Sequence, residues 1–260
     1  MKYVEWKQVG TNGLITELIL NRPNSLNAFD TLMAKEIIAV TEIISNSNAR
    51  VVLITSSSTK FFCTGADLKE RNQLTEEGWK QQHELFREMF AGIASLKQPV
   101  IAVVDGYALA GGFELILNCD FLLAAETAKF GLPEVTRGIM PGGGGTRLLS
   151  KRIALHLAKE WICTGRIVSA KEADRSGLLN RMTSPADLYE EALTFAETLA
   201  QNAPIAVQQA KKAIDRLFVL NNEEAKLVEQ EHYNTCISTE DRLEGVRAFV
   251  EKRPPKFVGN

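Results

Sequence analysis

The sequence predicts an α/β protein with a parallel sheet, followed by a mostly helical C-terminal region. Between residues 14 and 125, short apolar runs that suit buried strands alternate with longer amphipathic stretches that suit helices. From Ile153 onward, helical patterns follow one another with little between them. At 260 residues the chain is long enough for one large domain, or for a domain with an appendage.

Four runs are expected to form strands. Residues 14–20 alternate loosely between apolar and polar side chains and end at the turn sequence Asn-Arg-Pro-Asn. The runs at 51–55, 100–104 and 121–125 are almost continuously apolar, which is typical of buried strands. Apolar residues recur at helical spacing over 27–45 and 76–96, and another helical pattern begins near Phe113. A strand, a long helix and another strand, repeated, favour a parallel sheet.

The C-terminal part is expected to be helical over 154–161, 170–176, 187–201, 204–220 and 223–236. Residues 165–168 are expected to form a short extended link, and Gly177 to end the helix that precedes it. We place the end of the α/β core at residue 195 and treat residues 196–260 as a separate C-terminal helical region.

The composition disfavours several classes of protein. Lysine and arginine total 30 against 32 acidic residues, so no concentrated basic surface for nucleic acid is expected. No apolar run approaches the length of a membrane span, and the N-terminus lacks the apolar core of a signal peptide. The four cysteines, Cys63, Cys119, Cys163 and Cys236, lack the spacing of a metal site. We therefore expect reduced thiols, no metal, and a cytoplasmic location.

The segment around Glu114 is the first candidate for chemistry. It follows the small residues Ala110-Gly111-Gly112, which let the backbone approach a ligand closely, and it lies at the start of an expected helix. The first N–H groups of a helix have no partner within it, so together with the helix dipole they can hold an oxyanion. An acidic residue in the first turn is also a common stabilising feature, and this motif alone leaves both interpretations open.

A second group of small residues, Thr64-Gly65-Ala66, also suits close approach of the backbone. Asp67 is expected to cap the helical turn that follows, and Cys63 to fill space as a small apolar thiol. Glu134 follows Pro133 in a further expected turn, after the strand at 121–125. Both glutamates therefore follow turns beside buried strands, where α/β proteins often place their chemistry.

Other catalytic motifs are not supported. The segment Pro141-Gly142-Gly143-Gly144-Gly145-Thr146 lacks the Gly-Lys-Ser/Thr ending of a phosphate-binding loop, so we interpret it as a flexible entry to a helix, with Thr146 as a candidate cap. His83, His156 and His232 lie in helical patterns far from the glutamate segments, and we expect them to be surface or core residues. The sequence contains no Gly-x-Ser-x-Gly nucleophile elbow.

Several segments together resemble the enoyl-CoA hydratase/isomerase (crotonase) superfamily. The resemblance is carried by DGYALAGGFEL with CDFLLAAETAKFGLPEVTRGIMPGGGGT, by FFCTGADLKE and LNRPNSLNAFD upstream, and by TGRIVSAKEADRSGLLNRM and EGVRAFVEKRPPKF downstream. These segments span nearly the whole chain in the family's order, so they are more specific than any one motif. The resemblance implies a crotonase-like spiral of ββα units followed by a C-terminal helical region.

The resemblance also implies roles for individual residues. The backbone N–H groups of Ala66 and Gly111 would form an oxyanion hole. Glu114 would activate water, and Glu134 would deliver a proton to the α-carbon of the substrate. The residues expected to contact the substrate or its coenzyme A part are Leu26, Ala66, Asp67, Leu68, Lys69, Gly112, Phe249 and Lys252, with the last two reaching a neighbouring subunit.

Two departures from the family's usual pattern concern the acyl pocket. The family's glycine triplet is here Ala110-Gly111-Gly112, and Phe113 stands where relatives often carry a smaller residue. Both leave the chemistry intact but put the shape of the pocket in doubt. Met140 could face this pocket or fill the core.

The function implied is the reversible syn addition of water to a trans-2-enoyl-CoA thioester in fatty-acid metabolism. Coenzyme A belongs to the substrate, so no cofactor is expected. Alternatives are a hydratase for a branched or carboxylated acyl group such as 3-methylglutaconyl-CoA, a double-bond isomerase, or a non-catalytic CoA-binding member. Finding both glutamates favours hydration, since isomerases of the family commonly keep one. Residues 196–260 are expected to assemble a homotrimer or a hexamer.

Overall fold

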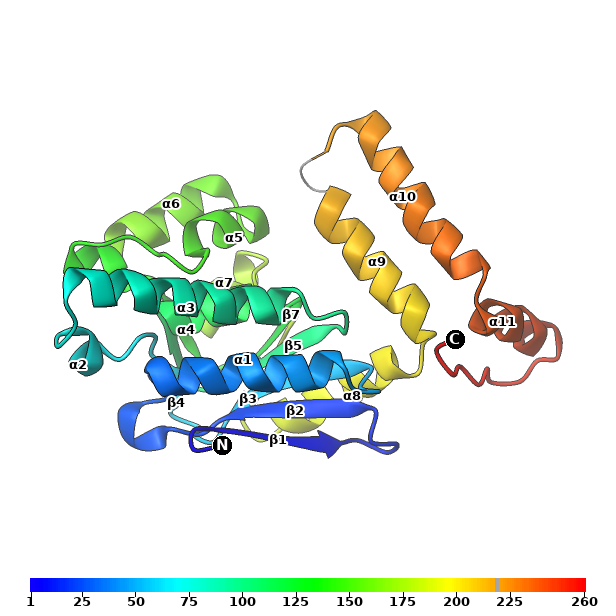
Figure 1. Cartoon of the computed structure of the whole chain (residues 1–260), viewed down its shortest axis with the longest axis horizontal. Helices are drawn as coiled ribbons and strands as arrows, with labels where there is room; N and C mark the ends of the chain where they lie inside the picture. Colours follow the sequence, from blue (N-terminus) through cyan, green and yellow to red (C-terminus); the bar gives the residue numbers. More distant parts are fainter. Residues whose placement is uncertain (218–219) are drawn as a thin grey trace.

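Two β-sheets form the body of the molecule (Figure 1). The computed structural model describes residues 1–217 and 220–260, and within them the larger sheet has six strands and the smaller sheet four. In their order across the larger sheet the strands are β1 Val4–Val9, β2 Ile15–Leu20, β3 Val51–Ser56, β5 Val100–Val104, β7 Phe121–Ala125 and β10 Arg181–Thr183. The strands of the smaller sheet are β4 Phe61–Cys63, β6 Tyr107–Leu109, β8 Lys129–Gly131 and β9 Val168–Ser169.

The helices alternate with these strands in the chain. They are α1 Thr31–Ser45, α2 Leu68–Arg71, α3 Glu76–Ala94, α4 Gly111–Leu117, α5 Gly145–Arg152, α6 Leu155–Thr164, α7 Ala170–Arg175, α8 Leu188–Ala200, α9 Pro204–Leu217, α10 Asn222–Ile237 and α11 Glu240–Val250, with short 3-10 turns η1 Pro23–Ser25 and η2 Pro133–Arg137. A strand of the larger sheet, a strand of the smaller sheet and a helical segment recur as β3-β4-α2, β5-β6-α4 and β7-β8-η2. This recurrence confirms the spiral of ββα units.

The predicted parallel sheet is confirmed for strands β2, β3, β5, β7 and β10. Strand β1 pairs antiparallel with β2 and was not expected, because most of its side chains are exposed and leave no apolar run. The short strands of the smaller sheet were also not identified as strands. Runs of two or three residues are too short to show a period of two.

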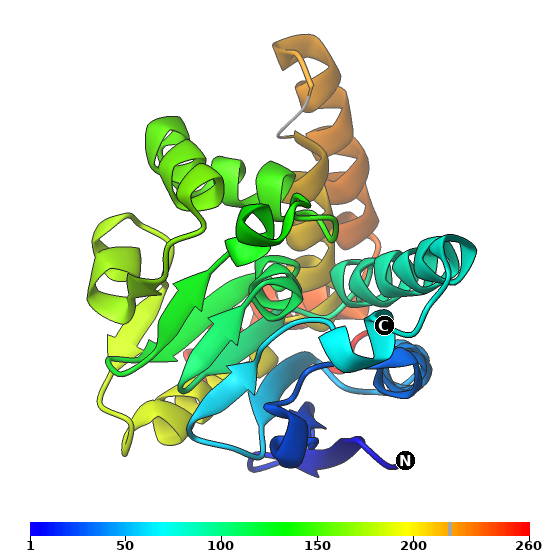
Figure 2. The same ribbon diagram turned by 90° about the vertical axis from the view of Figure 1, so that its left-hand side faces the viewer.

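Alternate residues of the larger sheet face two apolar layers. In β3, Val52 and Ile54 join the core formed with α1 and α3, whereas Val51 and Leu53 pack with α8. Figure 1 shows α1 and α3 crossing one face of this sheet, and Figure 2 gives the view turned by 90°. The continuous apolar run predicted for this strand follows from burial on both faces.

Most predicted helix and strand boundaries lie within a few residues of the observed ones. The first helix begins at Thr31 instead of residue 27, because the Asp30 side chain accepts the Met33 N–H at 2.8 Å and caps it. Gly177 follows α7 in the left-handed conformation (φ +80°), as predicted for a helix end. The prediction that Thr146 is a cap was wrong, since it lies inside α5 after the cap residue Gly144.

The C-terminal helices α9 and α10 lie side by side and project from the α/β body (Figures 1 and 2). Positions 218–219 of the helix predicted over 204–220 lie outside the described residues. Lys211 of α9 holds this region to the body, with its Nζ 2.6 Å from the Asp120 carboxylate and 2.9 Å from the Gln98 carbonyl oxygen. Large apolar side chains are exposed along these helices and α11: Ile214, Leu227, Tyr233, Ile237, Leu243, Val246, Phe249 and Val250.

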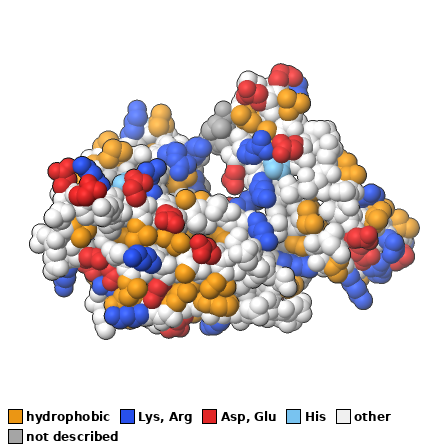
Figure 3. All heavy atoms as spheres, in the orientation of Figure 1, with side chains coloured by type: hydrophobic (Ala, Val, Ile, Leu, Met, Phe, Trp, Pro, Cys, Tyr) orange, Lys and Arg blue, Asp and Glu red, His pale blue; other side chains and the backbone are white. Residues whose placement is uncertain are grey.

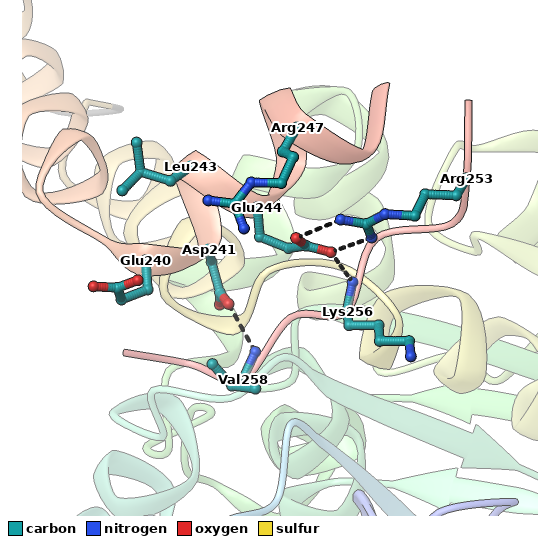
Figure 4. A pocket seen from close by; sticks show the side chains of 8 residues that line it. All are labelled: Glu240, Asp241, Leu243, Glu244, Arg247, Arg253, Lys256 and Val258. Carbon is teal, nitrogen blue, oxygen red and sulfur yellow. Dashed lines mark hydrogen bonds and ion pairs between the residues drawn. The ribbon is translucent and has the colours of Figure 1, made fainter. Parts of the chain in front are cut away.

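The residues after α11 fold back onto this helix around a hollow of about 400 Å³ (Figure 4). Glu244 pairs with the Arg253 guanidinium at 2.6 Å and accepts the Lys256 N–H at 2.8 Å. These contacts lower the pKa of Glu244 to about 2, chiefly through Arg253. Asp241 accepts the Val258 N–H at 2.7 Å. Glu244 and Asp241 therefore fasten the chain's own tail to α11.

In the space-filling view, acidic and basic side chains are interspersed over the face shown (Figure 3). Among the helices of the described residues, none has both the length and the apolar character that a membrane crossing needs.

Candidate active site

The two glutamates line one cleft of about 1590 Å³. Its walls come from five separate parts of the chain: η1 with the residues after it, the segment from Thr64 to Arg71, helix α3, the turn into α4, and residues 133–143. Segments that lie far apart in the sequence therefore meet around Glu114 and Glu134. This juxtaposition is what the strand-to-helix turns of a parallel sheet produce.

Glu114 lies in the first turn of α4 and is only 4% exposed. Its Oε1 atom accepts the backbone N–H of Gly143 at 2.7 Å and that of Gly145 at 2.9 Å. Burial raises the pKa of Glu114, while these two N–H groups and the Arg71 guanidinium act in the opposite direction. The carboxylate is thus buried but supplied with donors that stabilise its charged form.

The run at 142–145 consists of glycines, and its backbone packs closely against Glu114 and helix α3. A Cβ atom on Gly143 would lie 2.2 Å from the Phe90 ring and 2.8 Å from Glu114 Oε2. A Cβ atom on Gly145 would lie 3.0 Å from Glu114 Oε1. No side chain fits at either position without displacing the carboxylate. The run binds an internal carboxylate through its N–H groups, which accords with rejecting a phosphate-loop interpretation.

Glu134 lies in η2 after Pro133 and is 7% exposed. Its Oε2 atom is buried and has no hydrogen-bond partner among the described residues. Burial raises the pKa of Glu134 to about 7, and the negative charge of Glu114 acts in the same direction. At neutral pH this carboxyl group is therefore protonated in a substantial fraction of molecules.

The turn before Glu114 touches the turn that contains Ala66. A Cβ atom on Gly65 (φ +90°) would lie only 2.8 Å from the Gly111 nitrogen, so only glycine allows this approach. Phe29 pairs with Ala66 as a parallel bridge, since its N–H donates to the Gly65 carbonyl at 2.8 Å and its carbonyl accepts the Asp67 N–H at 2.9 Å. Among the described residues, neither the Ala66 N–H nor the Gly111 N–H has an acceptor within the chain.

Ala110 fixes the second of these turns. It adopts φ +50°, which is unusual for a residue with a side chain, and its N–H donates to the Gly131 carbonyl at 2.8 Å. Its own carbonyl accepts the Phe113 and Glu114 N–H groups and starts α4. The alanine in place of the family's glycine thus keeps the turn, at the cost of local backbone strain.

Most of the other predicted substrate contacts also line the cleft. Leu26, Asp67, Leu68 and Lys69 all do so. The Asp67 carboxylate is already engaged, since it caps α2 and pairs with the Arg22 guanidinium at 2.8 Å. Gly112 is buried behind the cleft, where a Cβ atom would lie 2.1 Å from the Cys63 carbonyl oxygen.

Phe249 and Lys252 do not join this cleft within the single chain. Phe249 lies on α11 and is 84% exposed, and Lys252 follows the end of that helix in the left-handed conformation (φ +56°). Their expected contact with coenzyme A on a neighbouring subunit stays a prediction.

One prediction about the cleft was wrong. His83 was expected to lie far from the glutamate segments, but it lines the same cleft and packs against Gly142, where a Cβ atom would lie 2.6 Å from its ring. Burial lowers the pKa of His83, and the positive charge of Arg71 acts in the same direction. Strands β5 and β6 separate His83 on α3 from Glu114 on α4 along the chain, and only the fold brings the two residues together.

Further cleft residues went unnoticed in the sequence: Arg71, Trp79, Phe86 and Phe90. The three aromatic residues come from the inward face of α3. Their helical spacing is the one feature of the sequence that could have placed them on this buried face. Met140 also lines the cleft, so it faces the pocket and is 63% exposed. Cys63 is buried, and burial raises the pKa of its thiol to about 12, consistent with a space-filling role.

In the part of the chain that the structure describes, no three His, Cys, Asp or Glu side chains lie close enough together to bind a metal ion.

Comparison with known proteins identifies the family. A family model described as enoyl-CoA hydratase/isomerase matches residues 10–260. The chain belongs to this family. It is 41% identical over 255 residues to the mouse protein named enoyl-CoA hydratase domain-containing protein 2, mitochondrial. The alignment covers 96% of this chain and 86% of the relative.

Solved structures agree with this assignment. An enoyl-CoA hydratase from Bacillus anthracis matches with a TM-score of 0.96 at 39% identity, covering 99% of this chain and 100% of the other. An enoyl-CoA hydratase from Mycobacterium tuberculosis H37Rv matches with a TM-score of 0.89 at 30% identity, covering 99% of each chain. The fold of this family member is therefore the crotonase fold, and the resemblance seen in its sequence is confirmed.

Proposed function

We propose that this family member is an enoyl-CoA hydratase that adds water to a trans-2-enoyl-CoA thioester and forms a 3-hydroxyacyl-CoA. The observation that carries the proposal is the pair of buried glutamates in one cleft, beside two backbone N–H groups that have no acceptor among the described residues. Water is the second reactant, and the proposal requires no cofactor.

The surroundings of the two carboxyl groups support a division of roles. Glu114 has N–H donors and a nearby guanidinium that favour its charged form, so it acts as the base that takes a proton from water. Glu134 has an unpartnered oxygen and a pKa raised to about 7, so it acts as the acid that protonates the α-carbon. Both carboxyl groups hold the same water molecule in this scheme, which gives syn addition.

The two free backbone donors suit the intermediate of this reaction. As the hydroxyl oxygen bonds to the β-carbon, negative charge moves to the thioester oxygen and an enolate forms. The N–H groups of Ala66 and Gly111 would donate hydrogen bonds to that oxygen, and donors fixed in advance stabilise developing charge without reorganisation. Lys69 and Leu68, on the outer part of the same cleft wall, are proposed to contact the coenzyme A part of the substrate.

We also propose that α9, α10 and α11 form an interface between copies of the chain, in a homotrimer or a pair of trimers. The exposed apolar side chains of these helices support an interface there, since the described residues of a single chain leave them open to solvent. In such an assembly Phe249 and Lys252 would complete the cleft of a neighbouring subunit. A cytoplasmic location stays a prediction.

The ultraviolet absorbance of the conjugated enoyl thioester provides the test. We expect it to disappear when the protein is mixed with crotonyl-CoA, a longer 2-enoyl-CoA, or 3-methylglutaconyl-CoA. Loss of absorbance with formation of the 3-hydroxyacyl-CoA would support hydration. No change with any of the three, from a protein that still binds their CoA thioesters, would contradict it and favour an isomerase or a non-catalytic binder.

A further inference from the structure

Arg71, the last residue of α2, is a buried cation on the wall of the cleft. It is 8% exposed, and among the described residues it is the one lysine or arginine that is buried. Taking a charged side chain out of water is unfavourable unless an opposite charge or hydrogen bonds compensate for it. A buried guanidinium at a ligand cleft therefore calls for a partner.

The protein holds the guanidinium of Arg71 by one edge and by its faces. Its Nε atom donates to Gln82 Oε1 at 3.0 Å, and the Gln82 amide is oriented in turn by hydrogen bonds to Glu70 Oε2 at 2.7 Å and Thr31 Oγ1 at 2.9 Å. The guanidinium carbon lies 4.1 Å from the centre of the Trp79 ring and 5.2 Å from that of Phe86. The plane of the group is fixed by these contacts before any ligand arrives.

The other edge of the group is free. In the part of the chain that the structure describes, neither Nη atom of Arg71 donates a hydrogen bond, and no carboxylate forms an ion pair with it. A guanidinium has five N–H donors and stays protonated, so the two Nη groups leave four donors without an acceptor among the described residues. Neither Nη atom is among the fully buried unpartnered atoms, so they remain accessible from the cleft.

The nearby carboxylates Glu114 and Glu70 attract Arg71 electrostatically, but in the described part of the chain no hydrogen bond or ion pair joins either of them to its guanidinium. Glu114 attracts Arg71 electrostatically, but its Oε1 atom is already held by the N–H groups of Gly143 and Gly145. Glu70 accepts from Gln82 and from the Thr31 N–H. The remaining neighbours on α3 are Trp79, Phe86 and the imidazole of His83, and none of these carries a negative charge.

We propose that Arg71 binds a carboxylate at the end of the acyl chain that is distant from the thioester. It would thereby select 2-enoyl-CoA thioesters that carry such a carboxylate. The two Nη groups match the two oxygens of a carboxylate, a geometry that adds both strength and direction to the contact. Arg71 and Glu114 line the same cleft and interact electrostatically, which places this contact in the part of the cleft that holds the proposed base. The inference rests on the proposed hydratase function and names the substrate class for the same site.

The test compares two substrates that share coenzyme A and the conjugated thioester. Glutaconyl-CoA carries a distal carboxylate, and 2-hexenoyl-CoA has an uncharged chain of similar length. We expect the ratio of kcat/KM for glutaconyl-CoA to that for 2-hexenoyl-CoA to fall at least about tenfold in Arg71→Met, the scale of a lost hydrogen bond to a charged group. Arg71→Lys, which keeps the charge but loses the planar fork, should give an intermediate ratio.

Arg87→Met is the matched control, because Arg87 is an exposed arginine on α3 whose guanidinium pairs with Glu84 at 2.9 Å, away from the cleft. Its ratio should equal that of the unmodified protein. An equal loss on both substrates in Arg71→Met would overturn the inference, since Arg71 would then act only through Glu114 or on the coenzyme A part. An unchanged ratio would overturn it as well.

Binding of non-reacting analogues separates this inference from the proposed activity. Glutaryl-CoA and hexanoyl-CoA lack the double bond, so their dissociation constants report binding alone. If the unmodified protein turns over no enoyl-CoA, the proposed function fails. The inference then stands if glutaryl-CoA binding weakens at least about tenfold more than hexanoyl-CoA binding in Arg71→Met, and it falls if both change equally.

Discussion

The surroundings of Glu114 and Glu134 differ in almost every respect except burial. Glu114 is held by the backbone N–H groups of Gly143 and Gly145 and lies near a buried guanidinium. Glu134 lies on a short 3-10 turn, with one oxygen that has no partner among the described residues. Both groups lose hydration. Glu114 receives N–H groups from two other residues in exchange, whereas Glu134 receives only its own backbone N–H.

This difference explains how one residue type can serve as both base and acid in a single cleft. Desolvation disfavours the charged form of each carboxyl group. Hydrogen bonds from Gly145 and Gly143 and the charge of Arg71 oppose this at Glu114, whereas at Glu134 the opposing groups are its own N–H and Arg137, and its pKa is still raised to about 7. Repulsion from the Glu114 charge further favours the protonated form of Glu134. A pair of identical groups becomes chemically unequal through its neighbours.

The largest expected effect comes from removing either carboxylate. Glu114→Gln and Glu134→Gln should each lower kcat on crotonyl-CoA by at least about a hundredfold, the usual scale for lost acid–base catalysis. Glutamine keeps the shape of the side chain and can still accept the Gly143 and Gly145 N–H groups, so the fold should be retained. Steady-state kinetics with circular dichroism provides the measurement.

Glu88→Gln is the control for these two variants, because Glu88 lies on the exposed face of α3 and outside the cleft. Its kcat should match that of the unmodified protein. A near-normal rate in Glu114→Gln or Glu134→Gln would remove that residue from the proposed acid–base pair.

The sequence revealed the elements that carry the two glutamates but not their surroundings. The apolar runs of β3, β5 and β7 and the helical spacing of α1 and α3 predict these elements, because burial on a sheet or helix face leaves a periodic signal. The glutamates and the small-residue turns were candidates because they follow turns beside buried strands, and the resemblance over nearly the whole chain implied their roles. The fold brings both glutamates into one cleft, and their catalytic roles stay a prediction.

What escaped prediction depends on contacts between distant parts of the chain. The donors to Glu114 lie 29 and 31 residues further along, in a glycine run that has no pattern of its own. His83 and Arg71 enter the cleft from α3 and α2, and neither carries a local motif that points to Glu114. Strands β4 and β9 contain only three and two residues, so they also give no periodic signal in the sequence.

An intermediate effect is expected from disturbing the support of Glu114 without changing the carboxylate. In Gly143→Ala, the new methyl group would lie 2.2 Å from Phe90 and 2.8 Å from Glu114 Oε2, so the backbone must shift and the N–H donor moves with it. We expect kcat to fall by about ten- to a hundredfold, since displacing a catalytic group by about 1 Å can cost that much.

Gly78→Ala is the matched control for this substitution. A methyl group on Gly78 would lie 3.4 Å from its nearest neighbour and outside the cleft, so kcat should be unchanged. If Gly143→Ala is folded and fully active, then the N–H groups do not hold Glu114 in its working position, and the contrast between the two glutamates loses its structural basis.

The smallest expected effect concerns stability, and it tests the other half of the contrast. The pKa of Glu134 rises from an ordinary value of 4.5 to about 7 on folding, so the folded state favours the neutral carboxyl group. Any stabilisation tied to that form is fully present below pH 4.5 and is lost as pH rises through about 7. Glu134→Gln has no charge to bury, so its Tm should exceed that of the unmodified protein at pH 8 and approach it at pH 5.

Glu88→Gln should show no such pH-dependent difference, because Glu88 is exposed. A Tm difference between Glu134→Gln and the unmodified protein that stays constant from pH 5 to pH 8 would mean that Glu134 ionises normally, and the proposed acid would then lack the proton it must donate at neutral pH.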